Sequence, residues 1–219
     1  MRLQRSLLLA LVLIAVSAAI GVWAWRILPA GAEIAVHFDA QGHADGFMPK
    51  TRALAIAPGV GLVVVVLLAM APRLLGGQRR PAPASGAFGF ALIGVAAMFL
   101  VGEAAVAVHA LDPAFDVMRW LFVAIGILLV LIGAGLGRAP PNDLVGIRTP
   151  WTLADERVWR RTHYFTGRLM GLAGVALAAL ASLGADHTDL LVALAACAAG
   201  PPIAGAIYSR MIADKPAAS

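Results

Sequence analysis

The stretch that decides the fold is VMRWLFVAIGILLVLIGAGL, which occupies residues 117–136 and holds a single charged side chain, Arg119. A bilayer core about 30 Å thick is crossed by roughly 20 apolar residues in a helix, so this stretch predicts a transmembrane helix. Five further stretches have the same character, at residues 7–28, 53–75, 87–110, 166–183 and 190–209. Together they predict an all-α fold, a polytopic membrane helix bundle of about six transmembrane helices.

The composition supports lipid as the main solvent of this chain. Of the 219 residues, 61% are hydrophobic and 13% are charged, whereas soluble domains carry about 25% charged residues. The net charge of +5 is therefore interpreted as a topology signal, and no direct contact with nucleic acid is expected. The single cysteine, Cys197, excludes an internal disulfide and a cysteine zinc site, and no cofactor is expected.

The loops predict the orientation through the positive-inside rule. With the N-terminus inside, the inner segments hold thirteen basic residues: Arg2, Arg5, Arg73, Arg79, Arg80, Arg138, Arg148, Arg157, Arg160, Arg161, Arg168, Arg210 and Lys215. The outer segments hold four: Arg26, Lys50, Arg52 and Arg119. Both termini are therefore expected in the cytoplasm. A cleaved signal peptide is the alternative for the first stretch, but its apolar run continues to Trp23 and Trp25, which favours a membrane anchor.

The outer loop, residues 29–52, is longer than its flanking helices require. It holds four side chains of metal-ligating types, His37, Asp39, His43 and Asp45. Alternating apolar residues over 34–38 predict a short extended segment, on which His37 and Asp39 would share a face. Imidazole with carboxylate suits zinc. The favoured alternative is a tight turn whose aspartates accept hydrogen bonds from loop amides, because no spacing here matches a zinc motif.

The same loop is expected to fold back over the outer end of the bundle. Phe38 and Phe47 are the predicted apolar anchors, and His37 is expected to lie within reach of Asp45 or of a neighbouring backbone group. Such a loop would present a binding surface, since loops held on a rigid scaffold commonly carry function.

The inner loop, residues 138–165, carries the second set of candidate residues. Thr152 is the predicted N-cap of an amphipathic helix that begins near residue 153 and leads into the fifth membrane stretch. Trp159 is expected to pack at the membrane or on the bundle. The loop is expected to be folded, serving either as a membrane anchor or as a partner-binding surface. The candidate ligand- or partner-binding residues are Asn142, Gly146, Arg148, Thr149, Pro150, Trp151, Thr152, Trp159 and His163.

Three features within the membrane stretches also stand out. Glu103 is an intramembrane acid, which predicts either a proton or cation site or a protonated carboxyl bonded to a neighbouring helix. Pro201 and Pro202 predict a kink or break in the last helix. Small residues four apart, such as Gly133 and Gly137, predict close helix contact. No nucleotide-binding loop, catalytic triad or HExxH motif is present, so the chain is not expected to be an enzyme.

Both loops resemble a known bacterial family. The inner loop resembles the signature of the SdpI-type immunity proteins, at Asn142, Gly146-Ile147-Arg148-Thr149-Pro150-Trp151-Thr152-Leu153, Val158-Trp159 and Thr162-His163. The outer loop resembles the domain of unknown function found ahead of that signature in longer members, at Pro29, His37-Phe38, Gly42, Asp45-Gly46 and Lys50. Asp39 stands where that pattern has asparagine.

The resemblance implies a multi-pass protein of the bacterial cytoplasmic membrane, in contact with the lipid bilayer. It implies protection from a secreted toxic peptide outside and retention of a regulatory protein inside. Three regions are expected: an N-terminal helix pair with the outer loop (1–76), the third and fourth helices (77–137), and the SdpI-type region (138–219). The alternatives are a small-solute or ion transporter that uses Glu103, and a metal-dependent membrane enzyme built on His37 and His43.

Overall fold

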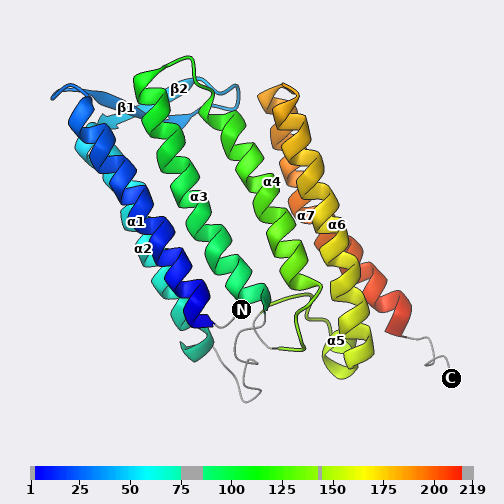
Figure 1. Ribbon diagram of the computed structural model, residues 1–219. Coiled ribbons are helices and arrows are strands. Elements are labelled where there is room, and N and C mark those ends of the chain that lie inside the picture. The colour runs from blue at the N-terminus through cyan, green and yellow to red at the C-terminus, as the bar shows by residue number, and fades with distance from the viewer. Residues whose placement is uncertain (1–2, 75–85, 143–144, 214–219) are drawn as a thin grey trace.

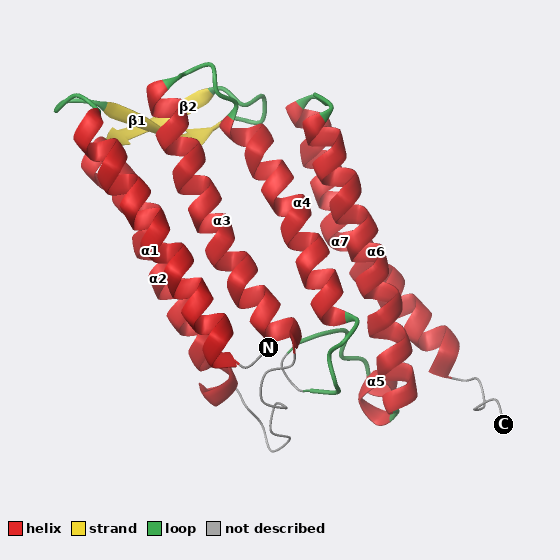
Figure 2. Cartoon of the chain, in the orientation of Figure 1, coloured by secondary structure: helices red, strands yellow, loops and turns green. Residues whose placement is uncertain are grey.

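The computed structural model describes residues 3–74, 86–142 and 145–213. Within these ranges the chain forms seven helices and one antiparallel hairpin (Figure 2). The elements are α1 (Leu3–Ile27), β1 (Glu33–Phe38), β2 (Ala44–Pro49), α2 (Lys50–Leu74), α3 (Gly86–Leu111), α4 (Val117–Leu136), α5 (Pro150–Ala154), α6 (Glu156–Ser182) and α7 (His187–Ala213). Arg2, Arg79, Arg80 and Lys215, counted above on the inner side, lie outside the described residues.

Six of these helices are long and apolar enough to span a membrane, which confirms the predicted polytopic helix bundle. They stand side by side, with α1 and α2 at one edge, α3 and α4 in the middle, and α6 and α7 at the other edge (Figure 1). The hairpin covers one end of the bundle, and α5 lies at the other end. Many large apolar side chains face outward, as lipid-facing helices require, Leu172 and Val175 among them.

Glycine lets α4 and α6 approach closely. A Cβ placed on Gly133 would lie 2.4 Å from the Gly167 carbonyl oxygen, and one placed on Gly126 would lie 2.6 Å from the Gly174 carbonyl oxygen. A side chain at these positions would push the two backbones apart. The predicted use of small residues for close helix contact is therefore confirmed along this seam.

Three details differ from the sequence-based expectations. Of the predicted kink or break in the last helix, the break is wrong, because α7 continues through Pro201 and Pro202 to Ala213; membrane helices tolerate proline where neighbouring groups satisfy the freed carbonyls. The fifth membrane helix starts about ten residues early, at Glu156, so the amphipathic segment is the first part of α6. The return strand β2 was not predicted, because Asp45 and Gly46 are residue types that strands disfavour.

Candidate functional site

At the end of the bundle that holds α5, Trp159 and His163 form the centre of a folded cap, which comprises residues 139–142 and 145–163. The two rings stack with centroids 3.9 Å apart, and both side chains are buried. Trp159 Nε1 donates to the Ala139 carbonyl at 2.9 Å. The predicted packing of Trp159 on the bundle is thereby confirmed.

The hydrogen bonds of His163 fix the state of its ring. His163 Nδ1 lies 2.8 Å from the Trp159 carbonyl oxygen, and the Ile147 amide lies 3.0 Å from Nε2. A carbonyl only accepts and an amide only donates, so Nδ1 carries the proton and Nε2 is bare. The ring is therefore neutral, and it ties the loop before α5 to the first turns of α6.

Gly146 is the residue that lets this loop reach the histidine. Its φ of +124° is a conformation that side chains other than glycine rarely adopt. A Cβ on Gly146 would lie 2.1 Å from His163 Nε2, in the space that the Ile147 amide needs to reach the ring. Glycine is thus required here by both the backbone conformation and the close approach.

The predicted role of Thr152 as an N-cap is wrong. Thr149 caps α5 instead, and the Thr149 amide donates back to Thr152 Oγ1 at 2.9 Å in a reciprocal capping box. Thr152 Oγ1 also lies 2.8 Å from the Ile147 carbonyl oxygen. The chain before Pro150 is extended, and the proline occupies the first helical position, where its missing N–H costs nothing, so α5 starts earlier than expected.

Asp155 caps the longer helix that follows. Its Oδ1 accepts from the amides of Arg157 and Val158 at 2.7 and 3.4 Å. The hydrogen bond from the Arg157 amide is the main cause that lowers the pKa of Asp155 below its ordinary value. A carboxylate at this N-terminus also suits the helix dipole.

Two further motif residues attach the cap to its surroundings. Trp151 Nε1 donates to Ser209 Oγ on α7 at 2.6 Å, and the Arg210 guanidinium lies over the indole ring. Asn142 Oδ1 accepts from the Val145 amide at 2.8 Å and so fixes the chain just before Gly146. These side chains hold the cap together, so most of the motif is structural.

The cap's outward-facing side is basic. Arg148, Arg160 and Arg161 are exposed, as is Pro150. Arg160 is weakly paired with Glu156 at 4.0 Å. A positively charged, solvent-facing surface of this kind suits an acidic partner or the headgroups of a membrane.

At the other end of the bundle, the hairpin brings the two predicted histidines to separate carboxylates. His37 Nδ1 lies 2.5 Å from Asp45 Oδ1, as expected, and His43 Nδ1 lies 3.3 Å from Asp39 Oδ2. Asp39 Oδ1 accepts from the amides of Gln41 and His43 at 2.9 and 2.8 Å. The bond from the His43 amide is the main cause that lowers the pKa of Asp39.

The same residues bear on the metal alternative. Strand β1 ends at Phe38, before Asp39, so His37 and Asp39 do not share a strand face. Within the described residues, no three His, Cys, Asp or Glu side chains converge on one point. The arrangement has the geometry of a tight turn, in which Asp39 satisfies the loop amides.

One of the two predicted aromatic anchors holds the hairpin, and the other does not. Phe38 packs edge-on against the His109 ring of α3, with centroids 5.4 Å apart. Phe47 is 56% exposed, so its predicted anchoring role is wrong. Ile34, on the opposite face of the twisted hairpin, is buried instead, in a cluster with Leu28 and Leu54.

Lys50 ties the hairpin to the end of α1. Its Nζ donates to the carbonyl oxygens of Trp25 and Leu28 at 2.8 and 2.6 Å, and it lies over the Trp25 ring. These carbonyls have no partner within the helix, so the buried ammonium satisfies them. Lys50 enters the sequence-based predictions only as an outer positive charge and as part of the family resemblance, so this anchoring role was not predicted.

The tip of the hairpin reaches the second half of the chain. A Cβ on Gly42, whose φ is +87°, would lie 2.8 Å from the His187 ring at the start of α7. His187 Nε2 lies 3.0 Å from Asp116 Oδ1, and Asp116 pairs with Arg119 at 3.0 Å. Burial acts to raise the pKa of Asp116, but the Arg119 amide and the His187 ring outweigh it, so that pKa is lowered. This network was missed, because its members are far apart in sequence.

Glu103 lies inside the bundle where α1, α2 and α3 meet. It is 1% exposed, and its Oε1 has no hydrogen-bond partner among the described residues. Gly21 leaves room for it, since a Cβ there would lie 2.5 Å from Oε1. An acid so placed faces the bundle interior, as expected of intramembrane acids.

Six candidate spans with a folded cap at one end and a hairpin at the other define a multi-pass α-helical membrane protein. Residues 138–207 match the model of the SdpI/YfhL protein family, and residues 12–62 match a domain of unknown function, DUF1648. The chain therefore carries an SdpI-type region behind a DUF1648 region, which confirms the resemblance drawn from the two loops.

A curated relative shares the SdpI-type region. The chain is 33% identical over 70 residues to a Bacillus subtilis (strain 168) protein named Immunity protein SdpI. The similarity covers 32% of this chain and 34% of the relative, so the chain spans about a third of the length of that protein. No solved structure matches the chain.

Proposed function

We propose that this chain is an integral membrane immunity and signalling protein of the bacterial cytoplasmic membrane. The hairpin would meet a secreted toxic peptide outside, and the cap would hold a regulatory protein inside. The observation that carries the proposal is the match of residues 138–207, which include the cap, to the family of a relative named as an immunity protein.

The charge on the cap supports an inner partner. The exposed arginines Arg148, Arg160 and Arg161 lie near α5, at the end of the bundle where α1 begins and α7 ends (Figure 1). The positive-inside rule assigns this end to the cytoplasm. The regulator would accordingly present an acidic surface, and truncating rim charges of this kind weakens association mainly through the on-rate.

The hairpin supports an outer ligand. It covers the opposite end of the bundle and contacts both halves of the chain, through Ile34 on one side and Gly42 on the other. Phe47 and Met48 remain exposed on β2, next to the hydrogen-bonded polar pair His37–Asp45. A surface that joins exposed apolar side chains to charge suits an amphipathic peptide.

The test is survival in the presence of the toxin. The chain would be expressed in Bacillus subtilis lacking its own SdpI, and growth would be measured against the toxic peptide. The expected result is growth at peptide concentrations that kill cells carrying the empty vector. Equal killing of both strains, with the chain present in the membrane fraction, would contradict immunity toward that peptide.

A transport function is the second candidate, and Glu103 is the observation that favours it. A buried carboxyl without a partner among the described residues resembles the acids that relay protons or bind cations in transporters. Glu103→Gln keeps the side chain's shape and removes its ability to bind or release a proton. If the variant protects cells as well as the wild type, the acid is not needed for immunity; if protection is lost at unchanged membrane levels, a transport step is implicated.

A further inference from the structure

The Glu103 carboxyl and a backbone carbonyl meet at Gly21, where α1, α2 and α3 come together. A Cβ placed on Gly21 would lie 2.5 Å from Glu103 Oε1 and 2.9 Å from the Leu54 carbonyl oxygen. The two oxygens, one from α3 and one from α2, therefore lie against the same point of α1. Glu103 and Leu54 are both buried, so the two oxygens meet away from bulk water.

The Leu54 carbonyl lacks its usual donor in α2. In an α-helix the carbonyl of residue 54 accepts from the amide of residue 58. That residue is Pro58, which has no N–H, so the Leu54 carbonyl is left without this donor. Glu103 Oε1 has no hydrogen-bond partner among the described residues. Two buried acceptors thus converge at Gly21, and a protonated carboxyl would supply the donor that they need.

Among the side chains that the structure describes, none supplies Glu103 with a counter-charge in an ion pair. The other charged or titratable side chains on the elements that pack around it belong to residues near the ends of those elements: Arg5 and Arg26 on α1, Lys50 and Arg52 on α2, His109 on α3, Arg119 on α4, and Glu33 and His37 on β1. The Lys50 ammonium is already taken up by the Trp25 and Leu28 carbonyls.

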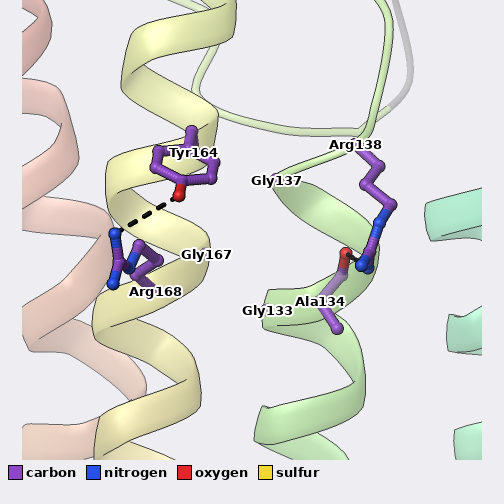
Figure 3. A pocket seen from close by; sticks show the side chains of 7 residues that line it. All are labelled: Gly133, Ala134, Gly137, Arg138, Tyr164, Gly167 and Arg168. Carbon is purple, nitrogen blue, oxygen red and sulfur yellow. Dashed lines mark hydrogen bonds between the residues drawn. The ribbon is translucent and has the colours of Figure 1, made fainter.

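Charged groups in the other helix contact of the bundle differ from Glu103 in this respect. Between α4 and α6, Arg138 donates to the Ala134 carbonyl at 2.8 Å and Arg168 donates to the Tyr164 hydroxyl at 3.3 Å (Figure 3). Both arginines are also exposed. A carboxylate that is buried without either a donor or a counter-charge is strongly unfavourable, which favours the neutral acid at Glu103.

We propose that Glu103 and the Leu54 carbonyl form an intramembrane proton-binding site. The proton is held on the Glu103 carboxyl, whose O–H donates to the Leu54 carbonyl oxygen and links α3 to α2 beside Gly21. A side chain on Gly21 would collide with both oxygens, so glycine is required there. The site deepens the transport candidate, on which its functional meaning rests, by naming a proton rather than a metal cation as the ion.

The test is infrared spectroscopy of the purified full-length chain in lipid bilayers at neutral pH. A protonated carboxyl gives a carbonyl stretching band that ionised carboxylates lack. This band should be present in the wild type and absent from Glu103→Gln. The Gln amide can itself donate to the Leu54 carbonyl, so the variant should fold. A difference spectrum without the acid band, or with carboxylate bands in its place, would overturn the proposal, because an ionised Glu103 would need a bound cation.

Pro58→Ala tests the partner carbonyl in a chain that keeps Glu103. It restores an N–H that donates to the Leu54 carbonyl, so the acid band should remain but change in frequency. Pro202→Ala is the matched control, because it restores an N–H in α7, at the other edge of the bundle (Figure 1). A band that Pro58→Ala leaves in place, or that both variants shift equally, would overturn the pairing with Leu54.

These spectra and the growth assay fail separately. The acid band reports whether Glu103 holds a proton, whatever the protein does in the cell. Protection by Glu103→Gln reports whether the acid is needed for function. An acid band in the wild type together with full protection by Glu103→Gln would support the proton site and contradict the transport candidate.

Discussion

Replacing Gly146 with alanine tests the hydrogen bond from the Ile147 amide to His163 Nε2, which holds the inner cap together. The new Cβ would lie 2.1 Å from His163 Nε2, so either the ring or the Ile147 amide must move and their hydrogen bond of 3.0 Å is lost. The unfavourable φ of +124° costs about 1–3 kcal/mol. A buried polar pair left unsatisfied costs about 1–3 kcal/mol more. The expected destabilisation is therefore about 2–6 kcal/mol.

The assay is thermal unfolding of the purified protein in detergent, followed by tryptophan fluorescence. A loss of 2 kcal/mol lowers the Tm by at least about 4 °C in a chain of this size. Gly171→Ala, on α6, is the control, because nothing lies within 4 Å of its added Cβ. In a His163→Ala background, Gly146→Ala should cost only the backbone strain. The proposed role of the Ile147–His163 hydrogen bond would be refuted by an unchanged Tm, or by an equal loss of stability from Gly146→Ala with and without His163.

Three further predictions concern the orientation, the cap and the hairpin. Reporter fusions after Gln41 and Asp186 should read outside and a fusion after Ala154 inside; an inside signal at Gln41 would overturn the charge argument. Thr149→Ala removes the N-cap of α5 and should lower the free energy of unfolding by about 1 kcal/mol in denaturant titrations, whereas an unchanged midpoint would contradict the capping role. The pKa of Asp39 is lowered by the turn amides, so its ionised form stabilises the folded hairpin above its ordinary value of 3.8, and this contribution is lost as the pH falls through the lower folded pKa. Asp39→Asn should abolish that part of the acid dependence, measured by exchange protection of the His43 amide.

The helices could be predicted from the sequence because lipid imposes a length and a composition on each span. The fourth stretch was located to the residue, at Val117–Leu136. The start of α6 was missed because Glu156 to Arg168 is polar and resembles a surface helix, although it packs its buried face, with Trp159 and His163, against the cap. Hydropathy alone does not distinguish a helix that lies at the membrane from one that extends out of it.

The contacts that depend on distant parts of the chain could not be predicted. Local sequence rules predicted Thr152 as the helix N-cap. The N-cap is instead Thr149, three residues earlier, because Pro150 occupies the first helical position and Thr149 and Thr152 form reciprocal hydrogen bonds. The link from Gly42 to His187 joins residues 145 positions apart, and no local pattern marks it. The pairing of His37 with Asp45 was foreseen because a turn of a few residues brings both ends together.

The most direct test of the account is growth in toxic peptide of cells that express the wild type, Gly146→Ala or Gly171→Ala at matched membrane levels, beside an empty vector. The wild type and Gly171→Ala should protect, whereas Gly146→Ala should lower the tolerated peptide concentration toward that of the empty vector, because the cap no longer folds around His163. Full protection by Gly146→Ala would show that the folded cap is not needed for immunity. Growth of empty-vector cells equal to that of the wild type would contradict the immunity function itself.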